Sequence, residues 1–441
     1  MRLAVPLAAA NLGQVLIGAV DTAVVGRLGE IELGAAGLGN SVFFVVAVVG
    51  MGIMLGLDPL VAQAIGADEP AQARRMLWQG GFLALLLGAP IALAVAGLGT
   101  LLERFGIAHV TAEPTRAYLF ARLFGLVPFL LFVACRSYLQ AVSITRPVVV
   151  SVVVANVVNL PLSWALVFGD AGLVRFGLPA LGVPALGVPG AAWASTACTV
   201  AQMLVLMYAV RKVQLPGARE RFLPSRELMK KALVLGAPIG LTMAAEFGVF
   251  SLVNVLMGNI DTRALAGHQV AITLASATFM VPVGIGAAAS VRVGHAIGRG
   301  DGPGTRRAGI IGLSSGMAFM SLAALTFLLL PKELAGIITD KRDVIAAAVP
   351  LLFIAAVFQL SDGAQAVLAG ALRGAGDTRF PLFANLAGHY LIGLPLGVLL
   401  AFHTGLGARG LWWGLSAGLT GVAVALSLRF MRISSQRVVR V

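Results

Sequence analysis

The sequence contains little charge for its length. Only 12% of its 441 residues are Asp, Glu, Lys or Arg, whereas soluble domains carry about a quarter. The hydrophobic fraction is 59% and the mean hydropathy is +0.93. These values exclude an ordinary soluble fold. Membrane spans of about 20 apolar residues each, joined by short loops, leave no room for a sizeable soluble domain.

Cysteine and the common catalytic motifs are also scarce or absent. The two cysteines, Cys135 and Cys198, lie inside apolar stretches, so the sequence predicts neither a disulfide framework nor a CxxC metal or redox site. No lysine follows a glycine, which excludes the phosphate-binding loop of an ATP-driven pump. The sequence contains no H-E-x-x-H and no G-x-S-x-G motif. We therefore expect no enzyme, and an energy source that is a gradient or a partner.

Long apolar runs bounded by charged residues, Gly and Pro predict about twelve transmembrane helices. The expected spans are 3–26, 36–58, 78–100, 118–140, 147–168, 188–210, 232–258, 264–290, 308–330, 345–370, 380–402 and 408–428. The first run could be a signal peptide, but it continues to about Gly26, which favours an uncleaved helix. The expected fold class is an all-α polytopic membrane protein.

The positive charge is distributed as expected for a membrane protein. The formal net charge is +13, but the basic residues lie in short loops between apolar runs, which indicates membrane topology rather than binding to nucleic acid. Of the 32 Lys and Arg residues, 22 fall on one side of the predicted membrane. By the positive-inside rule, both termini and a basic linker at 211–231 are predicted to be cytoplasmic.

An internal duplication organises the chain. A shift of 232 residues aligns Pro6 with Pro238 and Ala64-Ile65-Gly66 with Ala296-Ile297-Gly298. We therefore expect two six-helix lobes, 1–210 and 232–441, joined by the linker 211–231. Six spans is an even number, so both lobes enter the membrane from the same side, an arrangement typical of transporters with alternating access.

Three acidic residues lie within predicted spans, where a charge costs at least a few kcal/mol and marks an ion or substrate site by default. Glu246 lies about 20 Å into its span at 1.5 Å per residue, and Asp362 also falls at hydrocarbon depth. Asp21 lies near the outer end of its span, where a solvated or interfacial position is expected. The alternative for each is a helix cap or an interfacial pair with Arg. Four other carboxylates flank loops and are expected to be solvated or to cap helices: Asp58, Asp68, Asp301 and Asp377.

Polar uncharged residues within spans allow two interpretations. On the fifth span, Asn159 and Ser163 are four residues apart and share a face, with Asn156 one turn earlier. Their side chains either join helices or line a cavity. His268 and His389 either relay protons or pack as satisfied core histidines.

Several motifs together resemble one known family. They are Val20-Asp21-Thr22 with Gly26, Pro59 through Gly66, Arg136 through Ala141, Gly267-His268-Gln269-Val270-Ala271, Ser290 through Gly294, and Ala371-Leu372-Arg373-Gly374 with Gly376-Asp377-Thr378. They are similar to segments of the multidrug and toxic compound extrusion (MATE) transporters, most closely the bacterial sodium-driven branch. The resemblance covers nearly the whole chain. It implies two lobes around a cleft and export of organic cations or amphipathic toxins in exchange for Na⁺ or H⁺.

The resemblance also implies roles for individual residues. By motif, Glu246 and Asp362 match the cation-coupling carboxylates of the second lobe and are candidate Na⁺ ligands, while Asp21 matches the acidic residue of the first lobe. Asn159 and Ser163 match a polar pair, although relatives often carry an amide or acid at the position of Ser163. The candidate cavity lining is Asn156, Asn159, Ser163, Gln269 and Phe358. Some relatives carry tyrosine where Phe358 stands.

The expected partners follow from these assignments. We expect no cofactor besides Na⁺ or H⁺ as coupling ion, small-molecule drugs or toxins as substrates, a bacterial inner membrane as the location, no nucleic acid, and a monomer. The alternative function is a flippase or exporter of lipid-linked or polar metabolites from the same superfamily. A flippase of lipid-linked sugars needs a strongly cationic cavity, whereas the intramembrane charges here are mainly acidic.

Overall fold

The computed structural model describes residues 3–175, 177, 179–180, 182–213, 223–436 and 439–441. Residues 214–222 of the expected linker, with Arg219 and Arg221, lie outside this described part. So do Arg2 and Arg437, which were counted in the predicted topology. Within the described part every regular element is helical, and the all-α prediction is confirmed.

Twelve helices of the described residues are long and apolar enough to cross a membrane, and each corresponds to one predicted span. The elements are α1 (Ala4–Val25), α2 (Glu30–Leu55), α3 (Leu57–Gly66), α4 (Pro70–Leu101), η1 (Glu103–Phe105), α5 (His109–Ala141), α6 (Arg146–Val174), α7 (Val188–Lys212), α8 (Arg226–Ile260), α9 (Thr262–Gly298), α10 (Gly302–Leu329), α11 (Pro331–Ile338), α12 (Arg342–Gly374), α13 (Arg379–Leu386), η2 (Ala387–Gly393), α14 (Leu394–Phe402) and α15 (Ala408–Ser435). Most helices are longer than the predicted apolar spans, because their ends continue into polar residues that lie outside the apolar run.

The duplication is visible in the helix boundaries. The continuous segment formed by α2 and α3 and the single helix α9 each contain 37 residues, and they start 232 residues apart, at Glu30 and Thr262. α5 and α12 contain 33 residues each. The halves differ locally, because the first is interrupted at Gly56 between α2 and α3 whereas α9 continues through the matching Ala288. The same order of helices therefore occurs twice in the chain, and the two copies differ in where a helix is interrupted.

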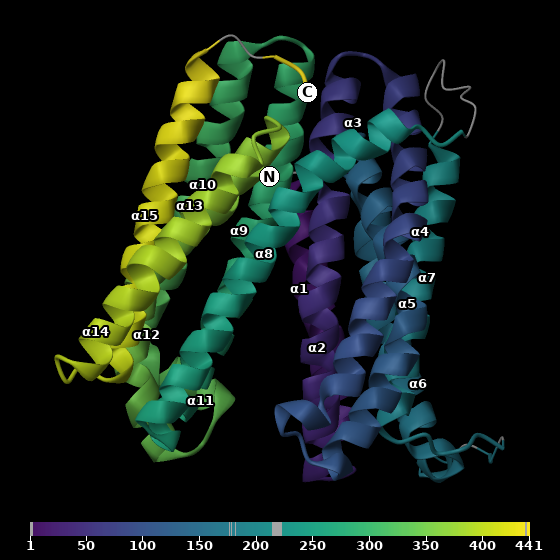
Figure 1. Ribbon diagram of the computed structural model, residues 1–441, viewed down its shortest axis with the longest axis vertical. Helices are drawn as coiled ribbons and strands as arrows, with labels where there is room; N and C mark the ends of the chain where they lie inside the picture. Colours follow the sequence, from purple (N-terminus) through teal and green to yellow (C-terminus); the bar gives the residue numbers. More distant parts are fainter. Residues whose placement is uncertain (1–2, 176, 178, 181, 214–222, 437–438) are drawn as a thin grey trace. The chain divides into compact units, whose positions relative to one another are not determined.

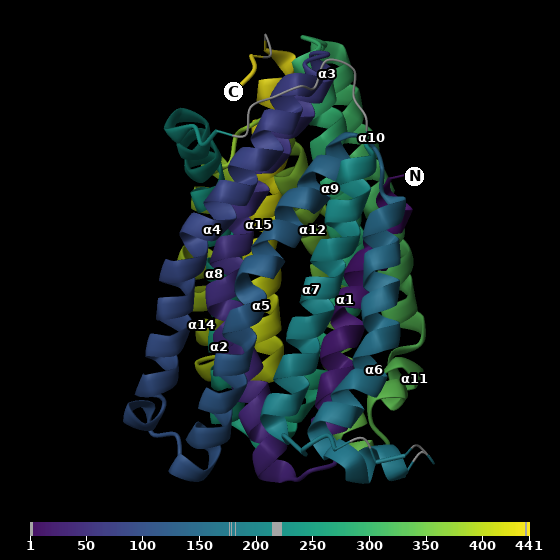
Figure 2. The same ribbon diagram turned by 90° about the vertical axis from the view of Figure 1, so that its right-hand side faces the viewer.

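Contacts divide the described residues into two compact units. The N-terminal unit comprises Ala9–Leu57 and Pro70–Val234, and the C-terminal unit comprises Met1–Ala8, Asp58–Glu69 and Leu235–Val441. In the N-terminal unit α7 packs against both α5 and α6 (Figure 2). In the C-terminal unit α12 packs against α9, α10 and α15, and α13 and α14 run beside α15 (Figure 1). A large apolar cluster that includes Phe358 and Trp412 forms the core of the C-terminal unit.

The short helix α3 belongs to the C-terminal unit although it follows α2 in the chain. Asp58 at its start is only 7% exposed and pairs with Arg373 Nε of α12 at 3.7 Å. Gln63 Nε2 donates to the carbonyl of Gly374 at 3.1 Å. Asp58 was expected to be solvated or to cap a helix. The solvated alternative is wrong, because the chain continues as α3 past the predicted end of the second span and carries Asp58, in the first turn of α3, against α12.

Residues 439–441 also pack on this end of the C-terminal unit. Arg440 forms two hydrogen bonds to the carboxylate of Glu69, at 2.8 and 2.6 Å. These bonds hold the pKa of Glu69 below its ordinary value. Their stabilisation is therefore present above that ordinary value and is lost as the pH falls through the lowered pKa. Because both side chains are substantially exposed, the contribution is small.

Two of the other carboxylates expected at loops are Asp301, which caps a helix as predicted, and Asp377, which pairs with an arginine. Asp301 is the N-cap of α10 and accepts a hydrogen bond from the backbone nitrogen of Gly304 at 2.8 Å. Asp377 pairs with Arg429 at 2.6 Å. Neither lies in a cavity described below, so both serve the ends of helices.

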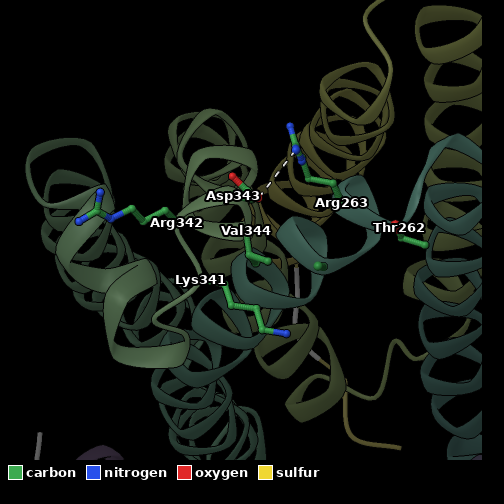
Figure 3. Close-up of a pocket in the computed structure, with 7 residues that line it drawn as sticks. Thr262, Arg263, Lys341, Arg342, Asp343 and Val344 are labelled. Atoms are coloured by element: carbon green, nitrogen blue, oxygen red, sulfur yellow. Dashed lines mark ion pairs between the residues drawn. The ribbon is translucent and has the colours of Figure 1, made fainter.

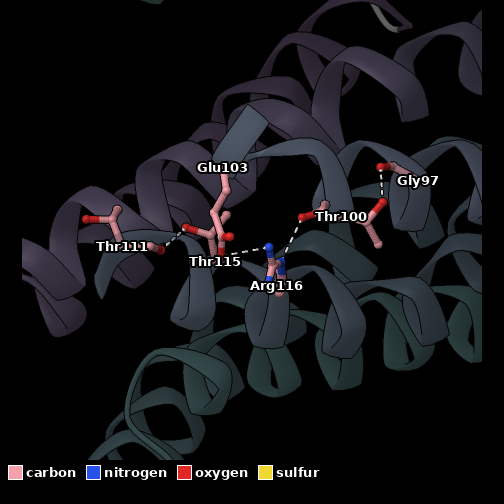
Figure 4. A network of polar contacts seen from close by, with 7 residues as sticks. Gly97, Thr100, Glu103, Thr111, Thr115 and Arg116 are labelled. Atoms are coloured by element: carbon pink, nitrogen blue, oxygen red, sulfur yellow. Dashed lines mark hydrogen bonds and ion pairs between the residues drawn. The ribbon is translucent and has the colours of Figure 1, made fainter. Parts of the chain in front are cut away.

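In the N-terminal unit, polar contacts join the end of α4 to the start of α5 (Figure 4). Arg116 donates from Nε to the carbonyl of Gly99 at 3.0 Å and from Nη2 to Glu103 at 2.9 Å. Thr115 donates to the carbonyl of Thr111 at 2.7 Å. Because the Arg116–Glu103 pair is more than a third exposed, it orients the turn more than it stabilises the fold.

Candidate ion and substrate site

Both strongest acidic candidates line one cavity inside the C-terminal unit. The cavity has a volume of about 300 Å³ and is lined by residues of α8, α9, α12, η2 and α15. Glu246 enters from α8 and Asp362 from α12, where Asp362 is 8% exposed. Two carboxylates from separate helices thus line one cavity at membrane-span positions. A cation between them relieves the repulsion of two like charges.

A buried amide network holds Glu246. Gln365 Nε2 donates to Glu246 Oε1 and, at 3.3 Å, to Asn385 Oδ1. Asn385 is fully buried and donates to the carbonyl of Pro381 at 3.0 Å. Sequence reasoning missed Gln365. Its spacing of three residues from Asp362 on the same helix was the available signal, since residues three apart share a helix face.

Aromatic rings form much of the cavity wall. Phe358 is 2% exposed, lines the cavity and contacts Phe250 edge to face at a centroid distance of 6.3 Å. On its other side Phe358 contacts Trp412 at 5.6 Å. Gln269 is exposed, and it reaches the cavity only through Asn254, to whose Oδ1 it donates at 2.8 Å. The structure therefore places Phe358 on the wall and Gln269 behind Asn254.

Two histidines complete the wall. His268 and His389 line the cavity and are each 1% exposed. Nδ1 of His268 and both ring nitrogens of His389 are buried and have no hydrogen-bond partner among the residues that the structure describes. Protein packing alone therefore leaves part of the hydrogen-bonding capacity of each ring unmet.

His389 lies in the π-helical segment η2. Such segments carry about one extra residue per turn and occur frequently at functional sites. Tyr390 of the same segment donates its hydroxyl hydrogen to the carbonyl of Ala245 at 2.9 Å. A Cβ on Gly418 of α15 would lie 2.8 Å from the Cα of Gly393, so only glycine allows α15 to pack this closely on η2.

Asp21 is the centre of a separate cluster in the N-terminal unit. Its Oδ1 accepts from Asn159 at 3.0 Å and from Ser163 at 2.8 Å, and its Oδ2 accepts from Ser195 of α7. Asp21 is 8% exposed. The solvated position expected for it is wrong, because three donors from α6 and α7 take the place of water. As expected for residues four apart, Asn159 and Ser163 reach the same carboxylate.

Asn156 joins helices. Its Nδ2 donates to the carbonyl of Gly13 on α1 and to that of Val152 on its own helix, both at 2.9 Å. The side chain is thus committed to a contact between α6 and α1. Of the two interpretations for this residue, the contact favours the joining of helices.

A larger hollow of about 480 Å³ lies at the starts of α9 and α12 (Figure 3). Its side chains include Lys341, Arg342 and an ion pair between Arg263 and Asp343 at 4.0 Å. Because both members of this pair are more than 60% exposed, the hollow is an open surface feature at helix ends. Within the described part of the chain, no group of three or more His, Cys, Asp and Glu residues is arranged to hold a metal ion.

The fold and these buried polar sites define a multi-pass helical membrane transporter, and comparison with known proteins identifies its family. The MatE family profile matches residues 6–165 and 238–399. The chain therefore belongs to the MatE family, whose members are transporters rather than enzymes. The two matches begin 232 residues apart, which confirms the internal duplication.

Curated relatives are similar over nearly their full length. The chain is 37% identical over 448 residues to the probable multidrug resistance protein NorM of Bradyrhizobium diazoefficiens, covering 100% of this chain and 94% of that protein. It is 38% identical over 445 residues to the multidrug resistance protein NorM of Burkholderia vietnamiensis, covering 97% and 92%.

Solved structures share the fold. The crystal structure of the eukaryotic MATE transporter AtDTX14 matches with a TM-score of 0.84 at 24% identity and covers 98% of this chain and 94% of that one. A multidrug resistance MATE transporter in an outward-facing conformation matches with a TM-score of 0.88 at 20% identity, covering 98% and 95%. At these identities the likeness shows the fold alone.

Proposed function

We propose that this protein is a secondary active multidrug efflux transporter that exports organic cations or amphipathic toxins by antiport with Na⁺ or H⁺. The relatives named as multidrug resistance proteins support the substrate class. The observation that carries the proposal is the pairing of Glu246 and Asp362 in one buried cavity of the C-terminal unit. Such carboxylates suit a hard cation through oxygen ligands and also suit a proton.

Coupling requires only that the two ligands prefer different states of the protein. In our proposal the inward-moving cation neutralises Glu246 and Asp362 and favours one orientation of the lobes, while the exported compound favours the other. Asp21, held by Asn159, Ser163 and Ser195, is the third coupling carboxylate. The duplicated helical plan supports alternating access by two lobes, 1–210 and 232–441.

The proposed location is a bacterial inner membrane, with a monomer as the working unit. The excess of Lys and Arg in short loops on one side supports cytoplasmic termini and a cytoplasmic linker at 211–231. Cysteine-accessibility labelling of single cysteines introduced into these loops checks the orientation. Labelling of linker cysteines from the periplasmic side would contradict it.

Counterflow in proteoliposomes tests the function. We expect uptake of a cationic dye to follow an imposed gradient of Na⁺ or H⁺, and to fall at least about tenfold in Glu246→Gln and Asp362→Asn, since ligands to a coupling ion contribute binding energy that transport requires. Leu391→Ala, at a side chain 76% exposed on η2, is the control and retains transport. Parent-like uptake in both carboxylate variants would overturn the site assignment.

A further inference from the structure

His268 and His389, two of the buried histidines of the C-terminal unit, have ring nitrogens without a hydrogen-bond partner among the described residues. Buried polar atoms in folded proteins nearly always have hydrogen-bond partners, so each exception needs an explanation. Gln365, Asn385 and Glu246 satisfy one another at the same cavity. His268 and His389 also line this cavity, but three of their ring nitrogens are buried without a partner among the described residues. A bound molecule is the partner that the geometry leaves available.

The surrounding structure fixes both imidazole rings. His389 contacts the ring of Phe250 at a centroid distance of 6.4 Å, and its neighbour Tyr390 is tied to the carbonyl of Ala245 at 2.9 Å. His268 contacts Trp412 edge to face at 5.8 Å. A site whose side chains are locked by packing discriminates between ligands better than a mobile one. The two rings are therefore held as fixed features of the cavity wall.

The size of the cavity suits more than a bare ion. A water molecule occupies about 30 Å³ of liquid, so a cavity of about 300 Å³ is far larger than one Na⁺ requires. The volume lies at the lower end of small-molecule sites, about 300–1,000 Å³. The space fits the headgroup of an organic cation.

The chemistry of the wall selects among organic cations. Aromatic faces such as Phe250 and Phe358 attract any cation, with or without hydrogen-bond donors. A neutral imidazole offers one acceptor nitrogen, which only a donor satisfies. A protonated amine carries an N–H that reaches a carboxylate or an imidazole, whereas a quaternary ammonium ion carries none and leaves the imidazole acceptors bare.

We propose that His268 and His389 are specificity-determining residues that make this cavity select protonated amines bearing an N–H over quaternary ammonium ions. The proposal rests on the proposed function, in that the exported compounds are organic cations. It differs from that function in naming which cations this cavity prefers and which two residues decide it.

A matched pair of ligands tests the proposal by equilibrium binding, which needs no gradient and no transport. The probes are N,N-dimethylbenzylamine, protonated at neutral pH, and benzyltrimethylammonium, which differ by one methyl in place of the N–H. Isothermal titration calorimetry on the purified full-length protein in nanodiscs gives both affinities. We expect the amine to bind about tenfold more tightly, since a site built to accept a hydrogen bond rejects a ligand that lacks the donor.

Variants assign the preference to the histidines. We expect His389→Phe and His268→Phe to lower the amine-to-quaternary affinity ratio at least about threefold, while His389→Gln, which restores an acceptor oxygen, keeps it near the parent value. Leu391→Phe, on the same segment but outside the cavity, keeps the parent ratio. Should one Phe variant not fold, the other and His389→Gln still decide.

The outcomes separate this inference from the proposed function. A parent that binds both probes equally, or binds neither, overturns the inference whatever counterflow shows. An unchanged ratio in the Phe variants also overturns it, because the carboxylates alone would then account for the preference. Absence of counterflow in the parent overturns the proposed function. The inference about the two histidines is then still decided by the ratio of the two binding affinities.

Discussion

At the scale of single residues, buried polar side chains hold carboxylates in place by hydrogen bonds. We call each such set of donors a clamp. In the C-terminal unit Gln365 connects Glu246 to Asn385. In the N-terminal unit, Asp21 accepts from an amide and two hydroxyls. In both cases the donors come from a helix other than the one that carries the acid. Such donors orient a carboxylate and stabilise its charge where water is excluded.

Replacement of Gln365 by Leu tests the first clamp. The variant leaves Glu246 and Asn385 without their donor, and loss of an orienting partner of an ion ligand typically costs about 10–100-fold in affinity or activity. We expect gradient-driven uptake to fall about tenfold, measured by counterflow at equal protein abundance. Gln202→Leu, which removes a buried amide nitrogen without a partner, is the control and keeps uptake. Parent-like uptake in Gln365→Leu would show that Glu246 needs no clamp.

Two replacements of Asp21 test the second clamp. In Asp21→Asn the serine hydroxyls can turn to accept, so we expect a loss of only about 1 kcal/mol in the free energy of unfolding. Asp21→Leu leaves three buried donors unmatched and should cost about 3 kcal/mol or more. Unfolding of the purified protein in detergent, followed by tryptophan fluorescence, measures both. Equal stability of the two variants would mean that the donors find other partners.

At the scale of elements, irregular helix geometry positions the cavity residues. η2 widens the helix between α13 and α14 and places His389 on the cavity wall. Glycines of α15 allow its backbone to lie against this segment, where a Cβ on Gly418 would be 3.1 Å from the nitrogen of Gly393. The helix break at Gly56 also positions residues, because the chain after it forms α3, which belongs to the C-terminal unit.

A pair of substitutions on α15 tests the close approach. Gly418→Leu forces α15 away from η2, and overpacking of this kind costs about 1–3 kcal/mol or more. We expect a clear drop in melting temperature and loss of amine binding. Gly421→Leu, where a Cβ would meet only the end of Ile392 at 3.9 Å, serves as the matched control. Similar melting temperatures for the two variants would contradict the packing argument.

At the scale of the whole molecule, the two sequence halves are not the two compact units. Residues 3–8 and 58–69, from the first half, pack with the helices of the second. Glycines make the approach possible, because a Cβ on Gly298 of α9 would lie 2.8 Å from the backbone nitrogen of Ala67. The pair of buried Asp58 and partly buried Arg373 is one charged contact of this interface, and the exposed pair of Glu69 and Arg440 is another.

A double-mutant cycle measures the contact between Asp58 and Arg373. Removal of one partner of a buried pair leaves an unpaired charge and costs about 3–5 kcal/mol, so we expect Asp58→Asn and Arg373→Gln each to lower stability by about 3 kcal/mol. The double variant should lose less than the sum of the two. Arg263→Gln, which breaks the exposed pair with Asp343, should leave the melting temperature unchanged. Additive losses would show that Asp58 and Arg373 do not interact.

Sequence alone determined the features whose physical cause is local. Twelve spans follow from apolar runs, since a helix must satisfy its own backbone in lipid. The duplication is read from aligned motifs such as Pro6 with Pro238. The choice of Glu246 and Asp362 as candidate ion ligands follows from the cost of a charge at hydrocarbon depth, whatever its neighbours are. None of these inferences needs a contact between distant residues.

Tertiary structure decided everything that depends on which helices meet. It buried Asp21 beneath donors from α6 and α7, and it placed Asp58 against α12. It gave Glu246 its amide partner and turned His268 and His389 to a shared cavity. The environment of these buried polar groups is set by side chains more than a hundred residues away in the chain, so their partners are decided only when the helices pack.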